Sequence, residues 1–133
     1  MKIIINGEQG VLGRVCSYAA KQALSGNEIV VVNSEKVIVS GSKKNVLERY
    51  RQKTSRGGHS LKGPKVSKQS FKLVKKAIIG MIPDHREGFG KQVSGRIKCY
   101  NGIPKEFERE KMVSFKSGKL DRYIEVGEIS KLI

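Results

Sequence analysis

Two short apolar runs, residues 2–6 and 28–33, flank a segment in which apolar side chains recur with helical spacing. Both runs are rich in β-branched residues, which is typical of buried strands. The segment between them predicts a helix that ends before Gly26, because its apolar positions are 11, 12, 15, 16, 19, 20, 23 and 24. Strand, helix and strand within about 33 residues predict a parallel unit with a right-handed crossover, and therefore an α/β fold.

The rest of the chain predicts shorter elements. Residues 37–39 are expected either to pair antiparallel with the preceding strand or to run extended toward a helix, because a parallel crossover needs more residues than the link provides. Ser42 is expected to cap a helix over residues 43–52. A second helix is predicted over residues 67–82, with Phe71, Val74, Ile78 and Met81 on its apolar stripe. Residues 96–100 predict a strand with one wet face, and residues 123–132 a closing strand or helix.

The positive charge is concentrated in the middle of the chain. The 133 residues carry a net charge of +15, with 27 Lys and Arg against 12 Asp and Glu. Residues 43–98 hold 16 of these bases and three acids, a net charge of +13. Such segregation is typical of a surface that binds phosphates, and nucleic acid is the commonest polyanionic partner. An anionic membrane surface is the rival, although we expect neither a membrane-spanning segment nor a signal peptide.

A basic, glycine-rich loop is predicted over residues 54–66, between two basic helices, and it is expected to be mobile without RNA. Glycines allow backbone amides to approach phosphate closely, while Arg56, Lys62 and Lys65 supply charge. Few aromatic residues lie among the bases, which favours structured RNA over stacking on single strands. A DNA-binding protein that uses the same charge is a further alternative, although no recognition helix or basic zipper is apparent.

The glycines Gly7, Gly10 and Gly13 resemble a dinucleotide-binding loop, which raises the alternative of an α/β nucleotide-binding protein or enzyme. Their G-x-x-G-x-x-G spacing lacks the tight first pair of that motif, and Asn33 stands where a ribose-binding acid is expected. We therefore expect Gly7 and Gly10 to form a strand-to-helix turn and Gly13 to allow close packing of helix on sheet. No cofactor is predicted.

Catalytic and metal sites are not expected either. Cys16 and Cys99 lie in apolar patterns without a Cys-x-x-Cys partner, so they predict reduced core thiols. His59 and His85 lie on basic loops without a plausible orienting carboxylate, so phosphate contact or solvent exposure is expected for both. The chain has no G-x-S-x-G nucleophile motif.

Five ordered motifs carry a resemblance to a known family: "VLGRVCSYAAKQALSG" at 11–26, "VVVNSEKVIVSG" at 30–41, "RGGH" with "GP" at 56–64, "IIGMIP" at 78–83 and "GRIKCYNGIP" at 95–104. Over roughly residues 5–104 the chain resembles the universal L-thirteen family of large-subunit ribosomal proteins. The short link between first helix and second strand, and the start at the first strand, resemble the archaeal and eukaryotic branch. Cys16 and Cys99 depart from that family's usual aliphatic residues.

The resemblance implies a three-layer α/β/α fold around a mostly parallel four-stranded sheet. It implies a non-catalytic, cytoplasmic protein that binds and bridges large-subunit rRNA during assembly, beside neighbouring ribosomal proteins. We expect a monomer outside the ribosome and one RNA-binding domain over residues 1–133, with a less certain C-terminal extension over 105–133. The charge pattern and the resemblance together predict rRNA contacts by Lys43, Lys44, Arg49, Arg51, Lys53, Arg56, His59, Lys62, Lys65, Lys68, Lys72, Lys75, Lys76, Arg86, Arg96 and Lys98.

Overall fold

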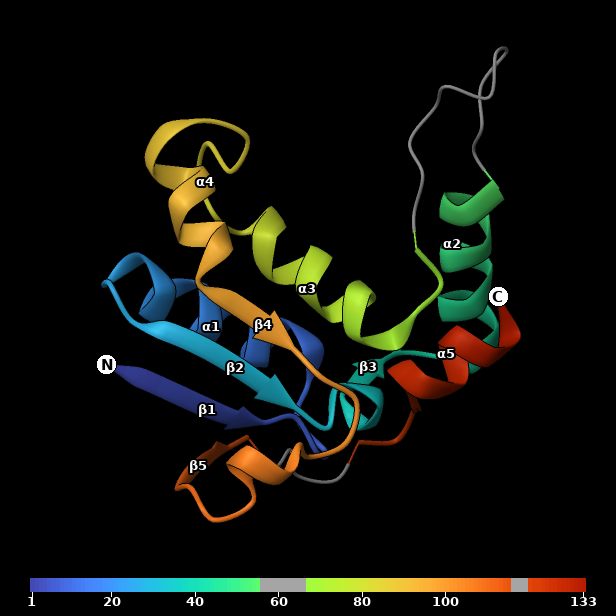
Figure 1. Ribbon diagram of the computed structural model, residues 1–133. Coiled ribbons are helices and arrows are strands. Elements are labelled where there is room, and N and C mark those ends of the chain that lie inside the picture. The colour runs from blue at the N-terminus through green and yellow to red at the C-terminus, as the bar shows by residue number, and fades with distance from the viewer. Residues whose placement is uncertain (56–66, 116–119) are drawn as a thin grey trace.

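The computed structural model describes residues 1–55, 67–115 and 120–133 (Figure 1). Its main sheet has the strand order β4-β2-β1-β5, and every neighbouring pair is parallel. The α/β class and the four-stranded sheet are therefore confirmed. The strands are β1 (Lys2–Asn6), β2 (Glu28–Val32), β4 (Ile97–Cys99) and β5 (Met112–Ser114). The sequence predicted the first three of these, whereas β5 was missed.

The helices agree with the apolar periodicity. α1 packs against α3 and joins β1 to β2 as predicted. α2 begins after Ser42, whose side-chain oxygen accepts a hydrogen bond of 3.3 Å from the Asn45 amide, so the predicted cap is confirmed. The segment after Pro83 forms α4. The bounds are α1 (Leu12–Leu24), α2 (Lys43–Ser55), α3 (Ser70–Gly80), α4 (Gly88–Gly95) and α5 (Val126–Leu132).

One apolar position of α3 was predicted wrongly. Met81 is 45% exposed, because the helix ends at Gly80 and the next residue no longer follows the buried stripe. Val74 and Ile78 are buried as predicted, and Leu73 and Ile82 are buried beside them. None of the helices in the described ranges is long and apolar enough to span a bilayer.

The strand between β2 and α2 does not pair with β2. After the 3-10 helix η1 (Ser34–Lys36), β3 (Ile38–Ser40) pairs antiparallel with β6 (Tyr123–Glu125) in a separate two-stranded sheet. β3 is thus the extended approach to a helix that was one of the two expectations. β6 leads directly into α5, so the C-terminal segment contains both a strand and a helix.

The two faces of the main sheet carry different residues. Ile5, Val31 and Cys99 are cross-strand partners that face α1 and α3 and belong to the main core. One residue earlier, Ile4, Val30 and Lys98 are partners on the opposite face. The 3-10 helix η2 (Lys105–Phe107) covers that second face, where Phe107 packs against Ile4, Val30 and Val32.

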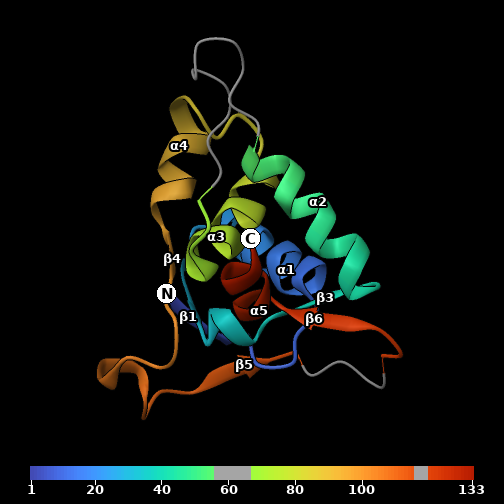
Figure 2. The same ribbon diagram turned by 90° about the vertical axis from the view of Figure 1, so that its right-hand side faces the viewer.

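Chain direction explains where η2 lies. The path from β1 to β2 to β4 moves across the sheet one way, with its helices on one face. The path from β4 to β5 moves back, so a right-handed connection must use the other face. Figure 2 shows α1, α3 and α5 on one side of the sheet and the segment that contains η2 on the other. The third layer of the fold is therefore thin, and part of this face stays accessible.

Candidate nucleic-acid interface

The loop after β1 has the outline of a dinucleotide-binding turn, but its amides bond within the protein. The Gly7 amide donates to the Val32 carbonyl at 2.9 Å, and the Gln9 amide to the Lys36 carbonyl at 3.2 Å. The Glu8 amide donates to the Asn6 side chain at 3.0 Å, and the Gly10 amide to the Gly7 carbonyl at 3.1 Å. A phosphate at this turn would have to displace these bonds.

Gly7 and Gly10 lie in the predicted strand-to-helix turn, and close packing requires a glycine at both positions. A Cβ on Gly7 would lie 2.5 Å from a Val37 methyl group, and one on Gly10 would lie 3.2 Å from the Phe115 carbonyl oxygen. The expectation for Gly13 is wrong, because it is exposed and a Cβ there would meet no atom within 4 Å. Gly13 lies on the outer side of α1, whereas Val15 and Cys16 face the core.

The polar residue at the end of β2 has a structural partner as well. Asn33 adopts a left-handed conformation (φ 55°), and its side-chain amide donates to the Asn6 side chain at 3.0 Å. Glu35 accepts a hydrogen bond of 2.9 Å from the Gly102 amide, so it ties the turn after β4 to η1. The polar groups at this edge of the sheet thus connect loops to one another.

α3 separates charge from apolar surface. Leu73, Val74 and Ile78 are buried, whereas Lys72 and Lys76 are exposed on the helix and Lys68 is exposed just before it. Lys75 is half-buried. Burial raises the pKa of the Cys99 thiol, and the positive charge of Lys75 offsets part of that rise. Three of the predicted lysines therefore lie in solvent along one basic segment, and Lys75 lies closer to the core.

α2 carries a second group of predicted residues, and some of them have partners within the protein. Lys44 and Arg49 are exposed. Lys43 lies 3.9 Å from the Glu128 carboxylate, and Lys53 lies 5.3 Å from the centre of the Tyr50 ring. The Arg51 side chain donates two hydrogen bonds to the Leu132 carbonyl, at 3.1 and 3.4 Å, so it holds the end of α5.

α5 connects the two basic helices. Besides the bonds from Arg51 on α2, the Ser130 hydroxyl donates a hydrogen bond of 2.6 Å to the Lys68 carbonyl just before α3. Val126 and Ile129 are buried in the main core, and the Val126 amide donates to the Val37 carbonyl at 2.8 Å. The end of α2 and the start of α3 are therefore held by one element (Figure 1). The predicted contacts Arg56, His59, Lys62 and Lys65 lie outside the described residues.

Arg96 and Lys98, the two basic residues around β4, have different surroundings. Arg96 donates a hydrogen bond of 3.2 Å from its guanidinium to the Ala23 carbonyl, so it caps the end of α1. Lys98 is exposed on the face opposite α3. Arg86 is exposed and His85 half-buried in the segment that joins α3 to α4. The predicted residues therefore occupy at least two separate surfaces.

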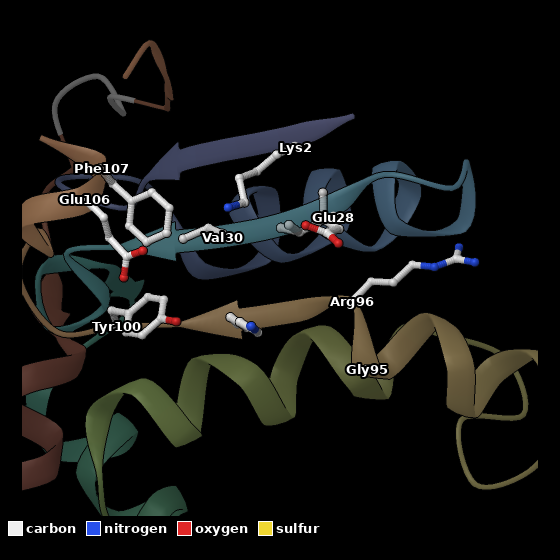
Figure 3. Close-up of a pocket in the computed structure, with 10 residues that line it drawn as sticks. Lys2, Glu28, Val30, Gly95, Arg96, Tyr100, Glu106 and Phe107 are labelled. Carbon is white, nitrogen blue, oxygen red and sulfur yellow. The ribbon is translucent and has the colours of Figure 1, made fainter. Parts of the chain in front are cut away.

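A polar pocket beside Lys98 contains residues that the sequence did not single out. Lys2, Glu28, Tyr100, Glu106 and Phe107 line this pocket together with Arg96 and Lys98 (Figure 3). The signal was weak, since the run that begins at Lys2 reads as one continuous buried strand. Only its register against β2 shows that Lys2 lies beside Glu28 on the accessible face.

Comparison with known proteins identifies the family of this chain. The family model for ribosomal protein L13 matches residues 1–106. The chain is 34% identical to large ribosomal subunit protein uL13 of Methanosphaera stadtmanae, over 100% of this chain and 97% of the relative. The chain belongs to the ribosomal protein L13 family.

Two further archaeal relatives extend this result. The uL13 proteins of Sulfolobus acidocaldarius and Archaeoglobus fulgidus are each 34% identical to the chain. They match over 98% of it, and over 92% and 86% of their own lengths, respectively. The match spans β5, β6 and α5, which lie beyond residue 106. Ribosomal protein L13 is a structural, non-enzymatic component of the large subunit and serves in translation, so this is also the role of the present chain.

The two cysteines belong to the core, as predicted. Cys16 and Cys99 are both buried and free. Burial raises the pKa of each thiol to about 12. Because the thiolate is the nucleophile and the metal ligand, both groups are inert at neutral pH. In the part of the chain that the structure describes, no group of His, Cys, Asp and Glu side chains could hold a metal ion.

Proposed function

We propose that this member of the L13 family binds folded large-subunit rRNA through α2 and α3 and bridges its phosphates during assembly of the subunit. The observation that carries the proposal is the division of α3, whose buried residues anchor it while Lys72 and Lys76 remain exposed beside Lys68. Lysines held on a rigid helix neutralise phosphates without a large loss of backbone entropy.

The support from α5 makes the two helices one surface. Arg51 and Ser130 join α2, α5 and the start of α3, so Lys44, Arg49 and Lys68 keep fixed relative positions. A surface with fixed charge spacing favours a folded RNA whose phosphates have matching positions over a flexible strand. In addition, the aromatic residues Tyr50 and Phe71 of these helices are half-buried, which limits their use for stacking on bases.

A salt series tests this proposal. Labelled large-subunit rRNA is titrated with the protein at several salt concentrations, with duplex DNA, NAD and ATP as competitors. We expect affinity to fall steeply with salt, duplex DNA to compete poorly, and the nucleotides not to compete. Equal competition by DNA would indicate a general polyanion binder, and a rise in melting temperature with NAD or ATP would indicate a nucleotide site at the Gly7 turn.

Matched variants localise the contacts. The triple variant Lys68→Gln, Lys72→Gln and Lys76→Gln should lower the slope of log affinity against log salt by about 2 to 3 units, because each phosphate contact contributes about 0.7 to 0.9. The control triple Lys21→Gln, Lys36→Gln and Lys111→Gln removes the same charge from exposed positions elsewhere. Equal losses in the two triples would show that net charge alone drives binding, and would contradict the proposed surface.

We also propose that the protein acts in the cytoplasm and is a monomer outside the ribosome. The support for a monomer is the net charge of +15, which makes two copies repel each other in the absence of RNA. Light scattering during size-exclusion chromatography should give a mass near 14.8 kDa at physiological salt. A mass of twice that value would contradict the proposal.

A further inference from the structure

The face of the main sheet that carries Lys98 is only partly covered. Parallel sheets are ordinarily covered on both faces. Here Phe107 covers Ile4, Val30 and Val32, whereas the neighbouring Lys2, Glu28 and Lys98 are exposed. These three residues help to line a pocket of about 270 Å³ (Figure 3). A polar hollow thus lies where such a sheet would ordinarily carry a further layer.

The pocket combines an apolar floor with charges of both signs. Val30 and Phe107 are 2% and 4% exposed and form the floor. Figure 3 shows the Lys2 ammonium and the Glu28 carboxylate over β2, between Phe107 and Arg96, and the Glu106 carboxylate at the aromatic end, between Phe107 and Tyr100. The Lys2 ammonium lies 5.1 Å from the centre of the Phe107 ring. A ligand that fits must therefore present both donors and acceptors around an apolar surface.

Aromatic side chains close one end of this pocket. The rings of Tyr100 and Phe107 are 6.0 Å apart and tilted by 41°. Phe107 is buried, but Tyr100 is only half-buried, so part of its side chain is accessible. An accessible aromatic ring beside a carboxylate suits a flat group that stacks while its edge donates hydrogen bonds.

Size limits the ligand to a single inserted group. Pockets for small molecules usually measure roughly 300 to 1,000 Å³, so a volume of about 270 Å³ is near the lower end. A helix or strand of a partner protein does not fit into such a space. One nucleotide or one long side chain does.

Charge distinguishes these two occupants. An inserted Lys or Arg would pair with Glu28 or Glu106 but would also meet the ammoniums of Lys2 and Lys98, and an inserted Asp or Glu would pair with those ammoniums but would also meet the two carboxylates. A guanine base avoids both conflicts, because its N1 and N2 groups donate hydrogen bonds to a carboxylate while O6 and N7 accept them from an ammonium. The attached phosphate is then attracted by the cations at the rim of the pocket.

We propose that this pocket binds one unpaired guanine nucleotide of RNA, stacked beside Tyr100 and held at its Watson–Crick edge by Glu106. The inference rests on the proposed function and deepens it. α2 and α3 belong to the opposite side of the sheet, so an RNA contact at Lys98 gives the protein a second, separate RNA-binding surface. Two such surfaces allow one small domain to bridge two segments of RNA.

The first experiment maps binding of short oligonucleotides by NMR. A hexauridylate with one central guanosine is titrated into the full-length ¹⁵N-labelled protein, beside the same oligonucleotide with adenosine or inosine. The guanosine oligonucleotide should shift the amide signals of Lys98, Tyr100 and Glu106. It should bind about tenfold more tightly than the adenosine oligonucleotide, as expected from hydrogen bonds to a charged group. Inosine, which lacks the 2-amino group, should lie between them.

Glu106→Gln is the decisive variant, because the sign of its effect is informative. Removal of an acid weakens electrostatic repulsion and by itself would strengthen RNA binding. We expect the opposite, namely loss of about tenfold in affinity for the guanosine oligonucleotide and loss of the preference over adenosine. Glu108→Gln is the matched control, since Glu108 is exposed and does not line the pocket.

Three outcomes would overturn the inference: equal affinity for the three oligonucleotides, shifts confined to α2 and α3, or pocket shifts produced only by an arginine-rich peptide. The third outcome would assign the pocket to a side chain of a neighbouring protein. Each of them would leave the proposed function in place if folded rRNA still binds with a steep salt dependence. Failure of folded rRNA to bind would instead contradict the proposed function.

Discussion

Ile4 and Ile5 are neighbours on β1 and both are buried, yet they face opposite sides of the same sheet. Ile5 lies in the main core under the helices, together with Val31 and Cys99. Ile4 lies in a small cluster that Phe107 covers, and the same face continues into exposed charges at Lys2 and Lys98. The side chains on the first face are buried under the helices and stabilise the fold, whereas the second face retains accessible groups that can bind a partner.

The same division separates the two basic surfaces. Lys72 and Lys76 are carried by a helix that packs on the first face, and they point away from the sheet into solvent. Lys98 is carried by a strand and lies directly on the second face. An assignment of all predicted bases to one site would therefore be incorrect, although they are close in the sequence.

The largest effect is expected from truncation of the two isoleucines. Ile5→Ala should lower the free energy of unfolding by about 3 to 4 kcal/mol, because it leaves a cavity in the main core. Ile4→Ala should cost about 2 kcal/mol, because the smaller cluster beside the pocket can relax or admit water. Urea denaturation measures both changes. Equal costs would show that the second face is as tightly packed as the first.

A second pair tests two glycines that follow β1, one in the turn and one in α1. Gly7→Ala should destabilise the fold by about 2 kcal/mol, since the new Cβ would meet a Val37 methyl group and two backbone oxygens. Gly13→Ala should stabilise it by about 0.5 to 1 kcal/mol, because alanine favours the helix and the space is open. Thermal unfolding of both variants measures these two changes in stability. Destabilisation by Gly13→Ala would restore the packing role that the sequence suggested.

The sequence predicted most of the fold, since periodicity and β-branched runs report local structure directly. It predicted β1, α1, β2 and the cap at Ser42, and the motifs identified the family. β5 was missed because a three-residue strand in a segment of mixed charge has too little pattern. Met81 was misplaced because the stripe could not show that α3 ends at Gly80.

The candidate site was harder to predict than the fold. The basic residues were recognisable from charge, but their partners depend on contacts between distant segments. Arg51 holds α5 and Arg96 caps α1, across 81 and 73 positions of sequence respectively. The pocket beside Lys98 depends on strand register and on η2, neither of which a local pattern reports. The local sequence therefore identifies a charged side chain, whereas the tertiary structure determines which groups that side chain contacts.

Arg96 and Lys98 are neighbouring bases that the sequence pattern does not distinguish. Arg96→Gln should lower the free energy of unfolding by about 1 kcal/mol, because the Ala23 carbonyl loses its hydrogen bond at the end of α1. Lys98→Gln should change it by less than about 0.5 kcal/mol, as is usual for an exposed position. Lys98→Gln should in turn weaken guanosine oligonucleotide binding more than Arg96→Gln. The reverse order of either effect would contradict this division of roles.

The smallest change in stability is expected from Lys98→Cys, which compares the two faces chemically at adjacent positions of β4. The introduced thiol should react rapidly with a thiol reagent at pH 8, whereas Cys99 should react only upon unfolding, because burial raises its pKa to about 12.

The raised pKa values of the two buried thiols also make the free energy of unfolding depend on pH. Near neutral pH, well below the ordinary thiol pKa of 9.0, the thiols of native and unfolded protein are protonated, so they do not affect the free energy of unfolding.

Between pH 9 and pH 12 the unfolded chain loses thiol protons that the native protein keeps, so the free energy of unfolding should fall as pH rises. Cys99→Ala should reduce the slope of the free energy of unfolding against pH.

If the pocket binds guanine, the guanosine oligonucleotide should also protect the thiol introduced by Lys98→Cys from the thiol reagent, and the adenosine oligonucleotide should protect it less. Rapid labelling of Cys99 in the native protein would show that both faces are accessible, and the contrast between them would fail.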